Sequence, residues 1–135
     1  MQPVHINPLA FLVAVIAKFI IGSAWFSPAL FLRPWQRLTG VTDEQMRGGM
    51  GKGIVIWIIG SLLMAFVLVH AVRYAGATNA PQGAAVGFFN WLGFVFVIGL
   101  EEYGAVKYPF KLVAIKTGGY LVELLVMGAI FAVWV

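Results

Sequence analysis

The chain contains no cysteine and very little charge. Of its 135 residues only 10% are charged, whereas a typical soluble domain has about a quarter. Without cysteine there can be no disulfide and no thiolate metal site. Two histidines do not by themselves make a specific metal site, so we expect neither a metal nor a cofactor.

Signatures of catalysis and phosphate binding are also missing. The sequence contains no HExxH motif, no nucleophile paired with a base and no pair of catalytic carboxylates. The glycine-rich stretch 48–53 contains Lys52 but lacks the GxxxxGK[ST] spacing of a phosphate-binding loop. We therefore do not expect an enzyme. The net charge of +4 comes from basic residues in particular loops, which favours a topology signal over a nucleic-acid surface.

Apolar residues dominate what is present. They make up 61% of the chain, and the mean hydropathy is +0.94. A small soluble domain has no core large enough to bury so many of them. Because a helix needs about 20 mainly apolar residues to cross a bilayer, we predict an all-α integral membrane four-helix bundle. Residues 1–135 would form a single transmembrane domain, with spans at about 8–27, 54–73, 83–102 and 112–135.

The first loop has a structure of its own. Pro28 is expected to end or kink the first span, because proline lacks the N–H that continues a helix. Apolar residues then recur at helical spacing around two arginines: Phe31, Leu32, Trp35 and Leu38 around Arg33 and Arg37. This pattern predicts a short interfacial helix at about 29–39. A further short helix should follow, capped by Thr42.

Lysine and arginine in the short loops predict the orientation. The first and third loops hold nearly all of them: Arg33, Arg37, Arg47 and Lys52 in the first, and Lys107 and Lys111 in the third, followed by Lys116. The second loop has only Arg73 at its edge. We therefore predict a multi-pass protein of the cell inner membrane. Its loops 28–53 and 103–111 would be cytoplasmic, and both termini would lie outside.

Several stretches resemble one family. "GSAWFSPALFLRPW" is similar to the G-x-x-W-[FY]-S-P-x-x-F…W signature of small bacterial membrane proteins known as domain of unknown function 1761. "NWLGF", "KYPFKL" and "GGYLVELLVMGAIFAVW" resemble that family's second half, so the similarity runs from about Asn7 to Trp134. The resemblance implies a four-helix membrane protein. It implies no activity and no functional residue.

A few polar residues fall near the centres of the predicted spans. An ionisable side chain at the bilayer centre costs about 2.5–3.5 kcal/mol on insertion scales, so such groups usually face the bundle interior and pair. Lys18 and Glu123 lie at similar depth and have opposite charge. We predict that they pair and that Asn90 hydrogen-bonds to one of them, with Ser61 at the same level. The pair could be a static lock or a proton or cation relay.

A second charged group lies at the predicted cytoplasmic side. Glu101 and Glu102 end the third span, and Lys116 lies about one turn into the fourth. Neighbouring residues of a helix point to different sides, so we expect only one glutamate to face inward. Snorkelling of these side chains to the interface is the alternative. Glycines should permit close helix contacts at five further positions: Gly60, Gly87, Gly118, Gly119 and Gly128.

Three functions fit these features. The first is a small transporter or an ion- or proton-conducting protein, working as a homodimer with an unknown small molecule or ion as substrate. The second is a structural or accessory protein whose buried charges only lock helix packing. The third is a lipid- or ligand-binding bundle that uses the aromatic residues Phe88, Phe89, Trp91 and Phe94. The candidate binding or relay residues are Lys18, Asn90, Glu101, Glu102, Lys116 and Glu123.

Overall fold

The computed structural model describes residues 2–106 and 108–134, and every regular element in these ranges is helical. The predicted all-α bundle is therefore confirmed. Four segments are long and apolar enough to cross a membrane: α1 (Pro8–Trp25), α4 (Met50–Tyr74), the continuous segment Ala80–Val106 and α7 (Phe110–Val133). Lys107, used above for the orientation, and residue 135, the predicted end of the last span, lie outside the described residues.

The bounds of the helices differ from the predicted bounds of the four spans. The first helix ends at Trp25, before Pro28, and the Asn7 side chain caps its start by accepting from the amides of Leu9 and Ala10. The second helix begins four residues earlier than predicted and ends one residue later, at Met50–Tyr74, and the third begins three residues earlier and ends four later, at Ala80–Val106. Hydropathy underestimates them because glycine and polar residues in a first or last turn lower the local average.

The third span is not a regular α-helix. It consists of α5 (Ala80–Trp91), the π-helical turn η1 (Leu92–Phe96) and α6 (Val97–Val106). A π-helical turn holds an extra residue and is frequent at functional sites. Hydropathy does not detect it, because the turn is as apolar as its neighbours.

Two short helices connect the first two spans. They are α2 (Leu32–Thr39), which begins later than the predicted residue 29, and α3 (Asp43–Gly48). Thr42 caps α3 through a capping box with Gln45, as expected. The Gln36 side chain donates to Asp43 at 2.8 Å, and Arg33 pairs with the same carboxylate at 3.1 Å. The hydrogen bond from Gln36, followed by the charge of Arg33, lowers the pKa of Asp43 below its ordinary value.

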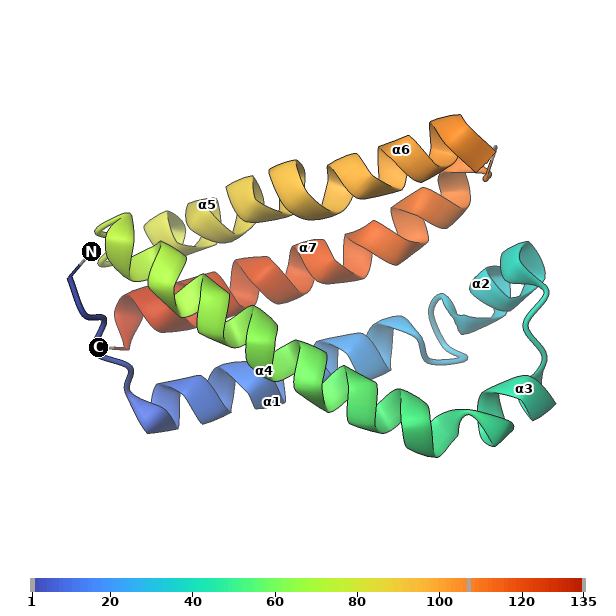
Figure 1. The fold of residues 1–135 in the computed structure, drawn as a ribbon, viewed down its shortest axis with the longest axis horizontal. Coiled ribbons are helices and arrows are strands. Elements are labelled where there is room, and N and C mark those ends of the chain that lie inside the picture. The colour runs from blue at the N-terminus through green and yellow to red at the C-terminus, as the bar shows by residue number, and fades with distance from the viewer. Residues whose placement is uncertain (1, 107, 135) are drawn as a thin grey trace.

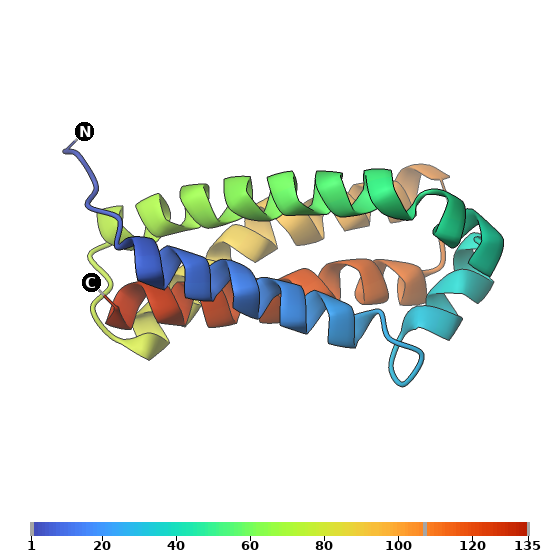
Figure 2. The same cartoon turned by 90° about the horizontal axis from the view of Figure 1, so that it is seen from below.

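Helix α7 is the central element of the bundle. It lies between α1 on one side and α5 and α6 on the other, and α4 crosses over them (Figure 1). Of its most apolar window 44% is buried, against 17–28% for the other three spans. Both chain ends lie at one end of the bundle and the two short helices at the other (Figure 2). We call these ends the terminal half and the loop half.

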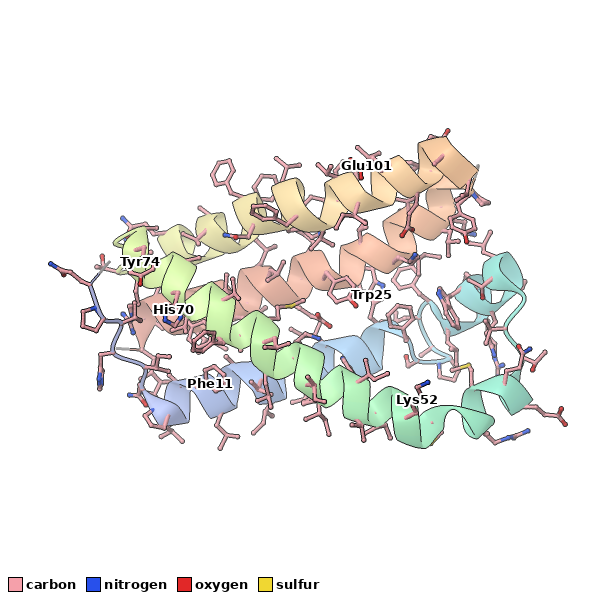
Figure 3. All side chains as sticks on the ribbon, viewed as in Figure 1. Phe11, Trp25, Lys52, His70, Tyr74 and Glu101 are labelled. Carbon is pink, nitrogen blue, oxygen red and sulfur yellow. The ribbon has the colours of Figure 1, made fainter. Side chains whose placement is uncertain are left out.

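Although Leu112, Val113 and Ile115 of α7 are buried in the loop half, the main cluster of buried apolar residues lies in the terminal half. All of its buried members in the spans lie on the terminal side of Lys18 in α1, Ser61 in α4 and Glu123 in α7: Ala14, Val15, Ala65, Leu68, Val69, Val72, Leu124, Met127, Phe131 and Ala132. The Tyr74 hydroxyl also ties the end of α4 to the N-terminal segment by donating to the Gln2 carbonyl at 3.3 Å (Figure 3). The loop half contains cavities of about 420 and 330 Å³.

Candidate functional site

Lys18 and Glu123 meet at the boundary between the two halves. Lys18 comes from α1 and Glu123 from α7, and Nζ lies 3.3 Å from Oε2. Their side chains are 2% and 5% exposed. The sequence predicted this pair from the matched depth and opposite charge of the two residues, and the structure brings them together. The carboxylate is not saturated, because Oε2 has no hydrogen-bond donor in suitable geometry among the described residues.

Aromatic rings and a glycine enclose the pair. The Lys18 Nζ lies 5.7 Å from the centre of the Trp57 ring and 5.6 Å from that of Tyr120. An added Cβ at Gly22 would lie 2.7 Å from the Trp57 ring and 3.0 Å from Oε1 of Glu123. Gly22 therefore has to be glycine for the indole and the carboxylate to approach α1 together.

An open cavity of about 420 Å³ reaches this pair from the loop half. Glu123, Tyr120 and Trp57 line its deep part, and Phe26, Gly53 and Lys116 line the part toward the first loop. A second cavity of about 330 Å³ shares Phe26, Lys116 and Tyr120 with it and extends to α2 and α3. The cavity thus connects the buried carboxylate of Glu123 with the loop half of the bundle.

The prediction for Asn90 was wrong. Its Nδ2 donates to the Val86 carbonyl of its own helix at 2.8 Å and makes no hydrogen bond to Lys18 or Glu123. The residue instead lines an apolar groove of about 580 Å³ between α4 and α5. Ser61 is buried at the predicted level, but its hydroxyl donates to the Trp57 carbonyl at 2.7 Å. The predicted polar layer therefore reduces to Lys18 and Glu123, since short polar side chains bond their own helix first.

The second charged group contains one ion pair. Lys116 donates to Glu102 at 2.9 Å, with both side chains about two-fifths exposed. Glu101 is exposed on α6 (Figure 3). As expected, only one of the two glutamates faces α7. Because Lys116 also lines the cavity that holds Glu123, the exposed pair lies on the route to the buried one.

Two tryptophans hold α7 in a way the sequence analysis missed. The Trp25 indole N–H donates to the Ile115 carbonyl at 2.8 Å, and that of Trp91 donates to the Thr117 carbonyl at 2.7 Å. The Trp25 ring covers Gly118 and Gly119, where any Cβ would come within about 3.0 Å of it (Figure 3). The sequence contains a signal for this contact. Trp25 shares a helix face with Lys18, and the glycine pair Gly118 and Gly119 lies near the polar residues of the last span.

The other glycines divide into two groups. Gly83, Gly87 and Gly128 bring α5 and α7 into backbone contact, because a Cβ on Gly87 would collide with the Leu124 carbonyl and one on Gly128 with the Gly83 carbonyl. Gly60 has no atom within 4 Å of an added Cβ, so its predicted role in close contact was wrong. It faces outward on α4.

The aromatic residues of the third span mostly face outward. Phe89 is 68% exposed and Phe94 is 71% exposed, whereas Trp91 donates inward to α7. Across residues 2–106 and 108–134, no group of three or more His, Asp or Glu side chains is placed to hold a metal ion. The Nδ1–H of His70 donates a 2.7 Å hydrogen bond to the Phe66 carbonyl of its own helix.

These features define the class. The protein is a multi-pass helical membrane protein, with four apolar helices and a buried ion pair at the closed end of an open cavity. The chain belongs to the family described as "Protein of unknown function (DUF1761)", whose sequence model matches residues 9–132. Neither the curated proteins nor the solved structures contain a match to the chain. The predicted family is thus confirmed, and its activity is unknown.

Proposed function

We propose that this protein is a small transporter or an ion- or proton-conducting protein, and that solute exchange takes place at the Lys18–Glu123 pair. One observation carries the proposal. The cavity of about 420 Å³ ends at a carboxylate that is only 4% exposed. A carboxylate that serves packing alone needs no such access.

The uneven packing of the bundle supports the same function. Alternating access requires a site that opens to one side of the membrane at a time. Here the main apolar cluster lies on the terminal side of the pair, and the cavities of about 420 and 330 Å³ lie on its loop side. This arrangement is what one of the two access states would require.

The residues take distinct roles in this proposal. Glu123 binds the solute or proton, and Lys18 is its internal counter-ion. Lys116 and Glu102 form the exposed pair at the route to the site. Asn90 no longer has a role there, because it lies in a different groove.

The proposal includes an oligomer and an orientation. Four helices enclose little space, and the cavity is bounded by α1, α4 and α7 alone, so we propose a homodimer that completes the path. We further propose the inner membrane as the location, with the loop half in the cytoplasm. The exposed basic residues of the first loop, Arg33 and Arg37 among them, support this orientation.

Flux through liposomes tests the proposal. Purified protein would be reconstituted and exposed to proton or cation gradients, and Glu123→Gln compared with wild type. Removing one oriented charge in a low-dielectric site should reduce flux about tenfold or more. Glu101→Gln is the matched control, since it makes the same change on an exposed position of α6 and should leave flux unchanged. No wild-type flux under any gradient would overturn the proposal.

A static lock is the second candidate. It is favoured by the position of the pair, which joins α1 to the central α7 directly beside the apolar core. Under this alternative Glu123→Gln loses thermal stability, and wild type shows no flux. The same two preparations therefore distinguish the candidates.

A further inference from the structure

The ammonium group of Lys18 lies in a cage built for a cation. Its walls are the Glu123 carboxylate at 3.3 Å and the rings of Trp57 and Tyr120 at 5.7 and 5.6 Å. A carboxylate combined with aromatic faces is a common means of binding ammonium groups in proteins. In this protein the side chain of Lys18 supplies the ammonium group from within the chain.

All three walls of this cage also line the cavity. Glu123, Trp57 and Tyr120 form its deep part, while Lys18 itself is 2% exposed and lies behind them. A molecule in the cavity would therefore contact the same carboxylate and the same rings from the opposite side. The ammonium group of Lys18 and a molecule in the cavity would therefore share the same cage.

The remaining walls suit an apolar body. Trp25 and Phe26 add two more aromatic side chains, and the Trp25 N–H is already bonded to the Ile115 carbonyl. Lys116 is already bonded to Glu102. The cavity of about 420 Å³ falls within the range of small-molecule sites, about 300–1,000 Å³. The positive charge of Lys116 is thus balanced by Glu102, and most of the lining is apolar.

We propose that the cavity binds a small organic ammonium ion with an aromatic or aliphatic body, whose cationic group replaces that of Lys18 at Glu123. The inference rests on the proposed function and names its substrate class. A buried carboxylate balances one positive charge, and a second one would be uncompensated. Lys18 therefore gives up a proton as the ligand binds: one N–H bond of Nζ breaks, its electron pair stays on nitrogen, and the proton is taken up by the solvent outside the cage.

The exchange couples one cation to one proton. The charged and titratable groups around the cage are Glu123 and Tyr120 from α7 and, toward the loop half, the Lys116–Glu102 pair. The last two balance each other, so the charge change is confined to Lys18 and the ligand. Higher pH should accordingly favour ligand binding, because the released proton is then taken up more readily.

Calorimetry on the purified protein in detergent tests the ligand class. The probe is 2-phenylethylammonium, and the controls of matched shape are neutral 2-phenylethanol and anionic phenylacetate. We expect the ammonium ion to bind at least about tenfold more tightly than either. Titration in buffers of different ionisation enthalpy should show about one proton released per ligand bound. Equal affinity for the three probes, or tighter binding of phenylacetate, would overturn the proposal.

Variants locate the binding. Trp57→Leu should weaken ammonium binding about tenfold, while Phe89→Leu, which removes a ring from the outer face of α5, should not change it. A second measurement does not depend on the wild-type cavity. Lys18→Ala empties the cage, so propylammonium should raise its thermal unfolding midpoint and 1-propanol should not. Equal effects of these two additives would contradict the cage assignment.

Failure of this inference differs from failure of the proposed function. Cation flux without any preference for ammonium probes would overturn the ligand class and leave transport standing. Selective ammonium binding without flux would overturn transport and leave the cage as a binding site.

Discussion

Among the residues that the structure describes, three ion pairs join a cationic side chain to a carboxylate in very different surroundings. Lys18 and Glu123 are 2% and 5% exposed, whereas the partners in Lys116–Glu102 and Arg33–Asp43 are between 40% and 57% exposed. Exposed pairs contribute about 0–1 kcal/mol because water competes for both charges. Removing one partner of a buried pair costs about 3–5 kcal/mol, since the other charge is left without compensation. Burial therefore separates the pair that matters for the fold from the two that do not.

This difference predicts the outcome of charge removal. Lys18→Met should lower the free energy of unfolding by about 3 kcal/mol, and Glu102→Gln by less than about 1 kcal/mol. Unfolding in detergent, followed by circular dichroism, measures both. The exchanged pair, Lys18→Glu with Glu123→Lys, should be more stable than either single variant. A double variant no more stable than the singles would show that the two side chains do not pair directly.

For single residues, the sequence predicted which charges pair but not which hydrogen bonds the polar side chains make. Matched depth and opposite sign found Lys18 and Glu123. The same reasoning failed for Asn90, because an amide on a helix can bond the carbonyl four residues back, as it does at Val86. Depth alone does not say which face of the helix a polar residue occupies.

At the level of elements, helix contacts divide into backbone packing and side-chain packing. Gly83 and Gly87 of α5 lie against Gly128 and Leu124 of α7 with no room for a Cβ. Small residues allow this approach, which increases dispersion contacts between helices in a medium that supplies no hydrophobic driving force. The hairpin of α5 and α7 is therefore the most tightly packed pair of the bundle.

A pair of alanine substitutions tests this reading. Gly87→Ala forces a methyl group into the Leu124 carbonyl and should destabilise the protein by about 1–3 kcal/mol. Gly60→Ala lies in a span of similar length but has nothing within 4 Å of the added Cβ, so it should be neutral or stabilising by up to about 1 kcal/mol. Thermal unfolding of the two variants in the same detergent makes the comparison. Equal effects of the two substitutions would mean that the close approach of Gly87 to Leu124 does not limit packing.

Two structural features could not be predicted from the sequence, for a physical reason. The π-helical turn Leu92–Phe96 and the tryptophan bonds to Ile115 and Thr117 involve backbone geometry that apolar side chains do not encode locally. The four spans were found because the bilayer imposes length and hydropathy on each helix independently.

The whole molecule is uneven along its length. The terminal half is packed around Met127 and Phe131, and the loop half contains cavities between α1, α4 and α7 and the short helices. The widening of the bundle toward α2 and α3 is visible in Figure 1. A two-state transporter would have to close this half and open the other, which the Gly-rich lead into α4 and the π-helical turn would permit.

Because the chain has no cysteine, single cysteines can report on this asymmetry without background. Ser23 lines the cavity and Ser61 is fully buried beside the core. A hydrophilic maleimide should therefore modify Ser23→Cys faster than Ser61→Cys, with each substitution nearly isosteric. The rate is measured by mass spectrometry of the protein in membranes. Equal rates would show that the cavity gives Ser23 no more access to water than the buried Ser61 has.

By itself, the sequence determined the membrane class, the number and order of the spans, and the two charges at mid-depth. Each of these depends on one helix meeting the bilayer, where hydropathy and the cost of an unpaired charge act locally. Only the tertiary structure decided that Asn90 lies apart, that Trp25 and Trp91 hold α7, and that a cavity of the loop half reaches Glu123. Those outcomes depend on helix rotation and crossing, which are fixed by contacts between residues such as Gly87 and Leu124 that lie far apart in the chain.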